Sequence, residues 1–298
     1  MLGKETEKTL RLNHYNNILT VTRRELDLKN QQKVNIFFEK EKPDIVIHLA
    51  AKVGGINANI TYPGDFIYDN LIIQANVINA SRIYGVKTFV FIGSSCIYPA
   101  NSQQPMCEDY LMDGKLEPTN EGYAIAKIAG IKLLEAINKQ YGFKSISLMP
   151  SNLYGPNDSF DPKHSHVLSA LVKKVVDAKY NKIDHINIWG TGIAKREFLH
   201  INDLANAIIF FLENSIDNLP FLNIGTGKEI SIKELLNLIV NEVEYDGKII
   251  WDKTKPDGML RKCLDISKMK NFGFQPKIKL QDGLKQVINE YKIQNNFL

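Results

Sequence analysis

The chain has 298 residues, of which 44% are hydrophobic, and a formal net charge of +4 at pH 7. This length and apolar content allow a large buried core, and they favour one larger domain with a smaller lobe. The charge is too small and too dispersed to indicate a nucleic-acid-binding protein. No run of about 18 apolar residues is present, so we expect no membrane span.

The N-terminus and the cysteines together favour a cytoplasmic protein. Residues 1–6 are polar and lack the apolar core of a signal peptide. The three cysteines (Cys96, Cys107 and Cys263) are odd in number and lack metal-ligand spacing, as is common in a reducing compartment. We expect no metal site, and we interpret four of the histidines as structural: His14, His48, His185 and His200.

In chain order, a polar helix is expected over residues 4–12, after which apolar strands alternate with helical patterns. This alternation predicts an α/β fold, a Rossmann-like doubly wound parallel sheet with a smaller C-terminal substrate-binding lobe. In the later part, Ser231 is expected to cap a helix, with Glu234 in the capping-box position. The predicted strands are 17–22, 44–50, 88–93, 145–150 and 186–189, and the predicted helices are 32–41, 65–84, 124–141, 165–178 and 280–291.

The start of the chain departs from the usual pattern of such a domain, in which a strand and a glycine-rich turn precede the first helix. Here Gly3 follows only Met1 and Leu2, so the first strand is apparently absent. Three explanations are open. They are a working protein that starts further upstream, a truncated and inactive relative, and another segment that fills the place of the strand.

Two segments carry the main chemical signal. Gly93-Ser94-Ser95-Cys96 follows the predicted strand at 88–93, and Tyr123 precedes Lys127 by four residues on a predicted helix, so both side chains share one face. An ammonium group beside a phenol favours the phenolate and lowers its pKa, which suits proton transfer to a carbonyl oxygen. The Tyr-x-x-x-Lys spacing alone often arises by chance, but the combination predicts ketone reduction.

With these segments the chain resembles the extended short-chain dehydrogenase/reductase superfamily, and within it the GDP-L-fucose synthase family. The resemblance covers nearly the whole chain. It implies an NADP-binding domain over residues 1–160, to which 184–215 returns, and a mainly substrate-binding lobe over 161–298. The further motifs that carry the resemblance are at 48–56, 116–120, 152–156, 189–190, 196–200 and 255–258.

The resemblance implies NADPH-dependent epimerisation at C3 and C5 and reduction at C4 of GDP-4-keto-6-deoxy-D-mannose, giving GDP-L-fucose. Cys96 matches the base of the family, and His166, rather than the neighbouring His164, matches its acid. Without the resemblance, Cys96 would be interpreted as a small buried hydrophobic residue. Tyr123 would protonate O4, Ser94 would orient that oxygen, and Lys127 would lower the Tyr123 pKa and bind the nicotinamide ribose.

The cofactor expected from the resemblance is NADP(H). Arg23 follows the predicted strand at 17–22, which is the second strand of the usual pattern, where arginine accommodates a ribose 2′-phosphate; the alternative is that Arg23 and Arg24 form a solvated turn. The other expected cofactor contacts are Gly3, Ile92, Gly93, Ser94, Ser95, Lys127, Pro150, Ser151, Asn152, Leu153 and His166.

The substrate contacts carried over from the family are Lys174, Trp189, Arg196 and Asp265. Arg196 suits the GDP diphosphate because a guanidinium group can bind two phosphate oxygens at once. Lys174 stands where the family has arginine, which leaves the sugar open. One alternative is therefore a C4 reductase of a related GDP-4-keto-deoxyheptose, and another is an inactive nucleotide-sugar-binding relative. The resemblance also implies a homodimer, in which helices 65–84 and 123–141 pair with those of a second copy.

Overall fold

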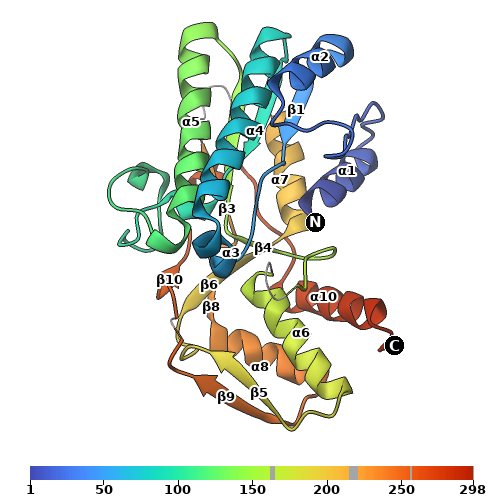
Figure 1. Ribbon diagram of the computed structural model, residues 1–298, viewed down its shortest axis with the longest axis vertical. Helices are drawn as coiled ribbons and strands as arrows, with labels where there is room; N and C mark the ends of the chain where they lie inside the picture. Colours follow the sequence, from blue (N-terminus) through green and yellow to red (C-terminus); the bar gives the residue numbers. More distant parts are fainter. Residues whose placement is uncertain (162–164, 215–220, 256, 298) are drawn as a thin grey trace.

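The structure is a computed structural model that describes residues 1–161, 165–214, 221–255 and 257–297, so His164 and Pro256 lie outside the described residues (Figure 1). Its central sheet has four parallel strands in the order β1 (Ile45–His48), β2 (Thr88–Ile92), β3 (Ser145–Pro150) and β7 (Leu222–Ile224). The predicted α/β fold with a parallel Rossmann-like sheet is confirmed.

Helices pack on this sheet as the chain winds back and forth. Helices α4 (Pro63–Ile83) and α5 (Glu121–Tyr141) lie side by side, whereas α7 (Ile201–Glu213) packs on β2 and β3 and is itself covered by α1 (Leu2–Leu12) (Figure 1). The predicted helices at 4–12, 32–41, 65–84 and 124–141 are all present, the second as α2 (Gln31–Glu41).

Residues 17–22 do not form the predicted strand. They are irregular, and the side chains of Leu19 and Val21 are 52% and 40% exposed. A strand is stabilised by hydrogen bonds to a neighbouring strand, and no described strand pairs with this segment. Among the described strands, β1 in turn pairs with β2 on one side only, and Ile45 at its start is 42% exposed.

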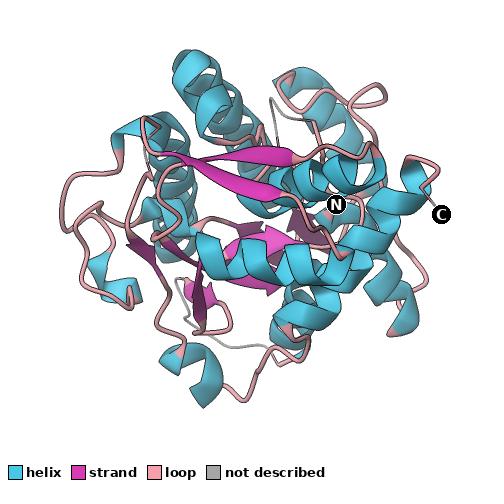
Figure 2. Cartoon of the chain, turned by 90° about the horizontal axis from the view of Figure 1, so that it is seen from below, coloured by secondary structure: helices cyan, strands magenta, loops and turns pink. Residues whose placement is uncertain are grey.

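The predicted strand at 186–189 exists, but it does not belong to the central sheet. It is β5 (His185–Trp189), which pairs with β9 (Lys248–Asp252) in a separate two-stranded sheet (Figure 2). Its side chains alternate between exposed and buried, with only Ile186 and Ile188 in a core. Such alternation is typical of a strand with one solvent-facing side, whereas central parallel strands are apolar throughout.

The smaller part of the molecule has its own hydrophobic core. Helices α6 (Val167–Tyr180), α8 (Ile232–Val243) and α10 (Leu280–Gln294) surround it together with β5. Helix α8 begins with the predicted capping box, since the Ser231 hydroxyl accepts from the Glu234 amide and the Glu234 carboxylate accepts from the Ser231 amide.

A third set of strands lies between the two cores. β6 (Lys195–His200) pairs in parallel with β4 (Asn152–Tyr154) and β10 (Arg261–Lys262), and antiparallel with β8 (Glu229–Ser231). β4 follows β3 after Ser151 alone, so the chain passes from one sheet to the next within one residue. The remaining helices are α3 (Ile56–Thr61) and α9 (Ser267–Asn271).

The division into domains at residue 160 stays a prediction. Within the returning segment, α7 contributes Leu204 and Ile208 to the core of the central sheet, whereas β5 belongs to the smaller part. None of the helices in the described part of the chain is long and apolar enough to cross a membrane.

Candidate active site

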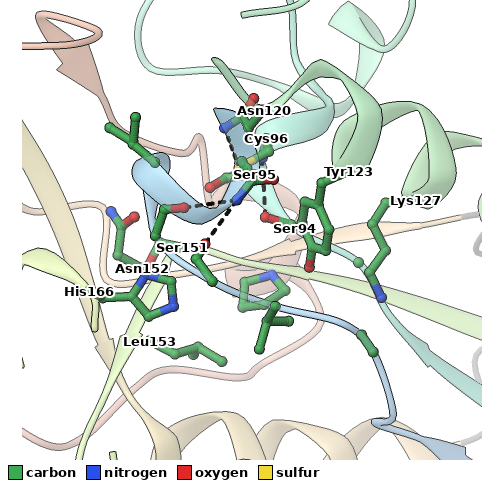
Figure 3. Close-up of a pocket in the computed structure, with 18 of the residues that line it drawn as sticks. Ser94, Ser95, Cys96, Asn120, Tyr123, Lys127, Ser151, Asn152, Leu153 and His166 are labelled. Atoms are coloured by element: carbon green, nitrogen blue, oxygen red, sulfur yellow. Dashed lines mark hydrogen bonds between the residues drawn. The ribbon is translucent and has the colours of Figure 1, made fainter. Parts of the chain in front are cut away.

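A cavity of about 580 Å³ opens beyond the carboxyl ends of β2 and β3, which is where parallel α/β sheets usually bind ligands. It brings together all five predicted catalytic residues: Ser94, Cys96, Tyr123, Lys127 and His166 (Figure 3). It is also lined by Arg196 and by predicted cofactor contacts, namely Gly3, Ile92, Gly93, Ser95, Pro150, Ser151, Asn152 and Leu153.

Ser94 and Cys96 are held in one tight turn after β2. The segment is not extended as far as Cys96, because Ser94 caps a single 3-10 turn, Ser95–Ile97, and its hydroxyl accepts from the Cys96 amide at 3.3 Å. Both side chains nevertheless line the cavity. Gly93 is required by close packing, since a Cβ there would lie 2.1 Å from the Met149 sulfur on β3.

Tyr123 and Lys127 come from the first turns of α5, one helical turn apart. Lys127 is only 4% exposed, and its Nζ donates to the Ile92 carbonyl oxygen at 2.7 Å. The same Nζ lies 5.8 Å from the centroid of the Tyr123 ring. Burial lowers the pKa of Lys127 to about 7.

The expected lowering of the Tyr123 pKa is not found in this geometry. Burial raises the pKa of Tyr123, and negative charge on Cys96 raises it further. The physical reason is that desolvation opposes the phenolate, while the Lys127 ammonium points at the Ile92 carbonyl oxygen. Tyr123 is therefore held as a neutral phenol, a form that can donate a proton.

Cys96 contacts two hydrogen-bond donors from distant parts of the chain. Asn120 Nδ2 and Lys262 Nζ each lie 3.2 Å from its Sγ, and Figure 3 shows the first of these contacts. Sequence reasoning assigned no role to either residue. Asn120 lies in the quoted motif 116–120, but Lys262 had no recognisable signal, because only the pairing of β10 with β6 brings it to the cavity.

His166 lies across the cavity from Tyr123 and Lys127 (Figure 3). It is the residue immediately before α6, in an extended conformation, and its side chain is exposed. The cavity therefore has an imidazole and a thiol on different walls, with the phenol of Tyr123 beside the thiol.

Arg196 projects from β6 into the cavity and is held by the loop before β10. Its Nη1 donates to the Met259 carbonyl oxygen at 2.6 Å. That loop is fixed by Asp257, whose carboxylate accepts from the Thr191 amide at 2.7 Å and from its hydroxyl at 2.6 Å. Burial lowers the pKa of Arg196, and the hydrogen bonds from Thr191 lower the pKa of Asp257.

Four predicted ligand contacts do not line this cavity. Arg23 lies in the turn after residues 17–22, and Asp265 accepts from the Ser267 amide at 2.8 Å, at the start of α9. Lys174 Nζ donates to the Asn187 carbonyl oxygen at 2.6 Å. Trp189 is 53% exposed at the end of β5, with Lys255 Nζ 5.5 Å from the centroid of its ring. Their assignments stay predictions.

Two of the histidines interpreted as structural have packing or capping roles. His48 is 4% exposed and stacks on Phe91 with an interplanar angle of 8°. Burial and the charge of Lys127 lower the pKa of His48 to about 3. His200 caps α7 by accepting from the Asn202 amide at 3.2 Å. Within the described ranges, no three acidic, cysteine or histidine side chains are placed to hold a metal ion.

The cavity fits the nicotinamide end of a dinucleotide. The Ser151 hydroxyl is buried in its wall without a hydrogen-bond partner among the described residues, and the Lys127 ammonium has three protons, of which one is used by Ile92. At the N-terminus of α1, Gly3 lines the cavity, and a Cβ built on it would meet nothing within 4 Å. Lys127, Ser151 and Gly3 would hold the ribose, the nicotinamide side and the phosphates.

Comparisons with known proteins agree with this arrangement. Residues 1–225 match the NAD dependent epimerase/dehydratase family. GDP-L-fucose synthase 1 of Arabidopsis thaliana is 50% identical over 98% of this chain and 90% of its own length. The crystal structure of a GDP-6-OMe-4-keto-L-xylo-heptose reductase from C. jejuni superposes with a TM-score of 0.92, at 36% identity, covering 99% of this chain and 95% of the other.

A GDP-mannoheptose C4 reductase from Campylobacter jejuni, solved with NADP bound, superposes with a TM-score of 0.88 at 37% identity, covering 98% of this chain and 95% of the other. The motifs, the fold, the cavity and the relatives all indicate the same family. The chain belongs to the NAD-dependent epimerase/dehydratase family and, within it, to the GDP-L-fucose synthases.

Proposed function

We propose that the protein converts GDP-4-keto-6-deoxy-D-mannose to GDP-L-fucose by epimerisation at C3 and C5 followed by NADPH-dependent reduction at C4. The observation that carries this proposal is the meeting of Ser94, Cys96, Tyr123, Lys127 and His166 in one cavity. The 50% identity to a GDP-L-fucose synthase over nearly the whole chain supports it.

Epimerisation requires a base and an acid on different faces of the sugar. The 4-keto group acidifies the protons on both neighbouring carbons, since the resulting enolate places its charge on O4. Cys96 removes such a proton, and His166, from the opposite wall of the cavity, returns one to the other face of the same carbon.

Reduction uses the other side of the same cavity. Tyr123, held neutral by burial, donates its proton to O4, and the Ser94 hydroxyl positions that oxygen. Lys127 anchors the ribose beside the carboxyl end of β2. NADPH, when bound, supplies the hydride that reduces C4.

The test is to incubate the purified protein with NADPH and GDP-4-keto-6-deoxy-D-mannose and to identify the product by NMR. We expect loss of NADPH absorbance and formation of GDP-L-fucose. Oxidation of NADPH with a product unchanged at C3 and C5 would contradict the epimerase half. No binding and no turnover would favour the inactive relative.

A second candidate is a C4 reductase of a GDP-4-keto-deoxyheptose. The superposition on a C. jejuni heptose reductase favours it, as does lysine at position 174, which keeps the charge of arginine but loses its forked geometry. A comparison of kcat/KM for the two GDP sugars decides between them. A higher value for the heptose would replace the first proposal.

The proposal also assigns the remaining predicted ligand contacts. We assign Arg23 to the 2′-phosphate of NADP, Arg196 to the diphosphate of GDP, and Lys174, Trp189 and Asp265 to the remainder of the GDP sugar. Domains 1–160 and 161–298 would bind cofactor and substrate respectively, with 184–215 shared. Single alanine variants should raise KM for NADPH at Arg23 and for the sugar at the other positions.

The chain is further proposed to act in the cytoplasm as a homodimer. Its three cysteines are free, and α4 and α5 carry exposed apolar side chains, among them Tyr68 at 62% and Tyr141 at 54%. Burying such a face against a second copy would remove apolar area from water. Light scattering should give twice the chain mass of 33.8 kDa, and a single chain mass would exclude the dimer.

A further inference from the structure

We propose that Lys262 is a positioning residue that holds Cys96 as a thiolate and thereby makes it the base of the epimerase step. The inference rests on the proposed function, and it names a residue that sequence motifs did not indicate. Three observations carry it: the contact with sulfur, the rigid placement of the lysine, and the charges around the thiol.

The contact is direct. Lys262 Nζ and Asn120 Nδ2 each lie 3.2 Å from Cys96 Sγ, so two donors converge on one sulfur atom. A thiolate accepts hydrogen bonds far better than a thiol does, and a neighbouring ammonium favours the charged form. Two donors aimed at one sulfur are therefore matched to the thiolate.

The backbone of Lys262 is fixed on both sides. On one side β10 pairs with β6, placing Lys262 opposite Arg196. On the other, the Cys263 amide donates to Gln104 Oε1 at 2.9 Å, and the Cys263 carbonyl oxygen accepts from the Met106 amide at 2.8 Å. The lysine therefore reaches the sulfur from a rigid support.

The next residue extends this support into the core. The Leu264 amide donates to the carboxylate of Glu197 at 2.7 Å, and Glu197 is fully buried. Because Glu197 also accepts from the amides of Thr226 and Gly227, the strand that carries Lys262 is joined to β6 and to the loop after β7.

The titratable groups near Cys96 come from several elements. Lys262 of β10 and Arg196 of β6 are cationic, and the phenol of Tyr123 on α5 is neutral. Glu117 and Asp257 are acidic groups that act on Arg196, and Asp158 and His166 line the same cavity as Cys96. Lys262 is the cation that touches the sulfur, which is why its removal should change the thiol most.

Removal of the sugar proton starts from the thiolate form of Cys96. The S–H bond forms on Cys96 as the C–H bond of the sugar breaks, and the electron pair of that bond moves to O4. Protonation of the carbon from the opposite face consumes the proton of His166. Exchange with water then removes the thiol proton and restores the imidazolium. A Cys96 that started as a thiol could not begin this sequence.

The first experiment needs no sugar. Iodoacetamide is attacked by the thiolate, which forms an S–C bond and expels iodide, so its rate reports the thiolate fraction. Alkylation of Cys96 is followed by peptide mass spectrometry from pH 5 to 10, with Cys107 as the internal reference. In Lys262→Met we expect Cys96 alkylation at pH 7 to slow by about tenfold and its pH midpoint to rise.

Two variants make this measurement decisive. Lys262→Arg keeps the charge and should stay within about twofold of the wild type, whereas Lys233→Met removes an exposed lysine on α8 and should change nothing. Equal Cys96 rates and pH midpoints in wild type and Lys262→Met would overturn the proposal. Should Lys262→Met not fold, Lys262→Gln replaces it, with the same expected result.

The second experiment separates the two half-reactions. In D₂O, epimerisation introduces deuterium at C3 and C5, and NADPH oxidation reports reduction at C4. Lys262→Met should lose deuterium incorporation by tenfold or more, with little change in the KM for the sugar. A rise in KM with unchanged exchange would instead make Lys262 a substrate contact. A wild type without turnover would refute the proposed function, while the alkylation result would still decide the role of Lys262.

Discussion

The ammonium nitrogen of Lys127 lies 2.7 Å from the carbonyl oxygen of Ile92, so α5 is joined to the last residue of β2 by a buried cationic group. This contact orients the lysine towards the sheet end rather than towards Tyr123. Because burial is the dominant influence, the pKa of Lys127 falls to about 7, well below the ordinary value of 10.5.

The first prediction concerns the pH dependence of stability. Between pH 7 and about 10 the unfolded chain binds one more proton at this lysine than the folded protein does, so stability rises with pH. Lys127→Met removes this dependence, which amounts to at most about 1.4 kcal/mol per pH unit. Urea unfolding at pH 7, 8 and 9 measures it. The control is Lys132→Met, an exposed position on the same helix, which should keep the wild-type slope.

The second prediction separates the phenol from the thiol. Tyr123→Phe removes the proton donor for O4 but leaves Cys96 and His166 in place, so reduction should fall by about 10²- to 10⁴-fold. Deuterium incorporation at C3 and C5 should persist. Loss of both activities in a folded variant would show that Tyr123 also serves the epimerisation.

The third prediction concerns acid stability. His48 stacks against Phe89 and Phe91, and its pKa of about 3 lies below the value of 6.5 for an exposed histidine. The unfolded chain therefore binds more protons between these values, and stability is lost as the pH falls from 6.5 towards 3. His48→Phe should give a shallower loss in this window. His185→Phe, at an exposed position on β5, should leave the wild-type profile unchanged.

The fourth prediction concerns the buried carboxylate of Glu197. It accepts from the amides of Gly227 and Leu264 at 2.9 and 2.7 Å, and also from that of Thr226. Glu197→Gln places an NH₂ group against backbone donors and should lower the free energy of unfolding by about 1–3 kcal/mol. Thermal unfolding measures this, with the half-exposed Glu135→Gln as control. Equal stability of both variants would show that the amide rearranges without loss.

Much of the fold could be predicted from local patterns. The apolar run at 88–92 and the glycine and serines after it locate the end of β2, and helical spacing places Tyr123 beside Lys127. These relationships depend on residues close in sequence or on the common geometry of parallel strands. The capping box at Ser231 was predictable for the same reason.

The features that the sequence did not predict depend on pairings between distant segments. Residues 17–22 have a strand-like composition but no described neighbour to bond with, and β5 joins β9, which lies some sixty residues further along the chain. Lys262 sits in a strand of two residues that no periodicity could reveal. Its approach to Cys96 depends on the pairing of β10 with β6 and on the buried Glu197, neither of which is encoded within one segment.

Ser151, the single residue between β3 and β4, limits how this molecule can vary. Pro150, at the end of the central sheet, precedes this residue, and Asn152, in the strands between the two cores, follows it; all three residues line the cavity. One inserted residue would shift the following strand by about 3.3 Å and reverse which face its side chains point to. Changes in substrate range through insertions are therefore confined to other connections, such as the long segment between β2 and α5, whereas this junction must keep its length.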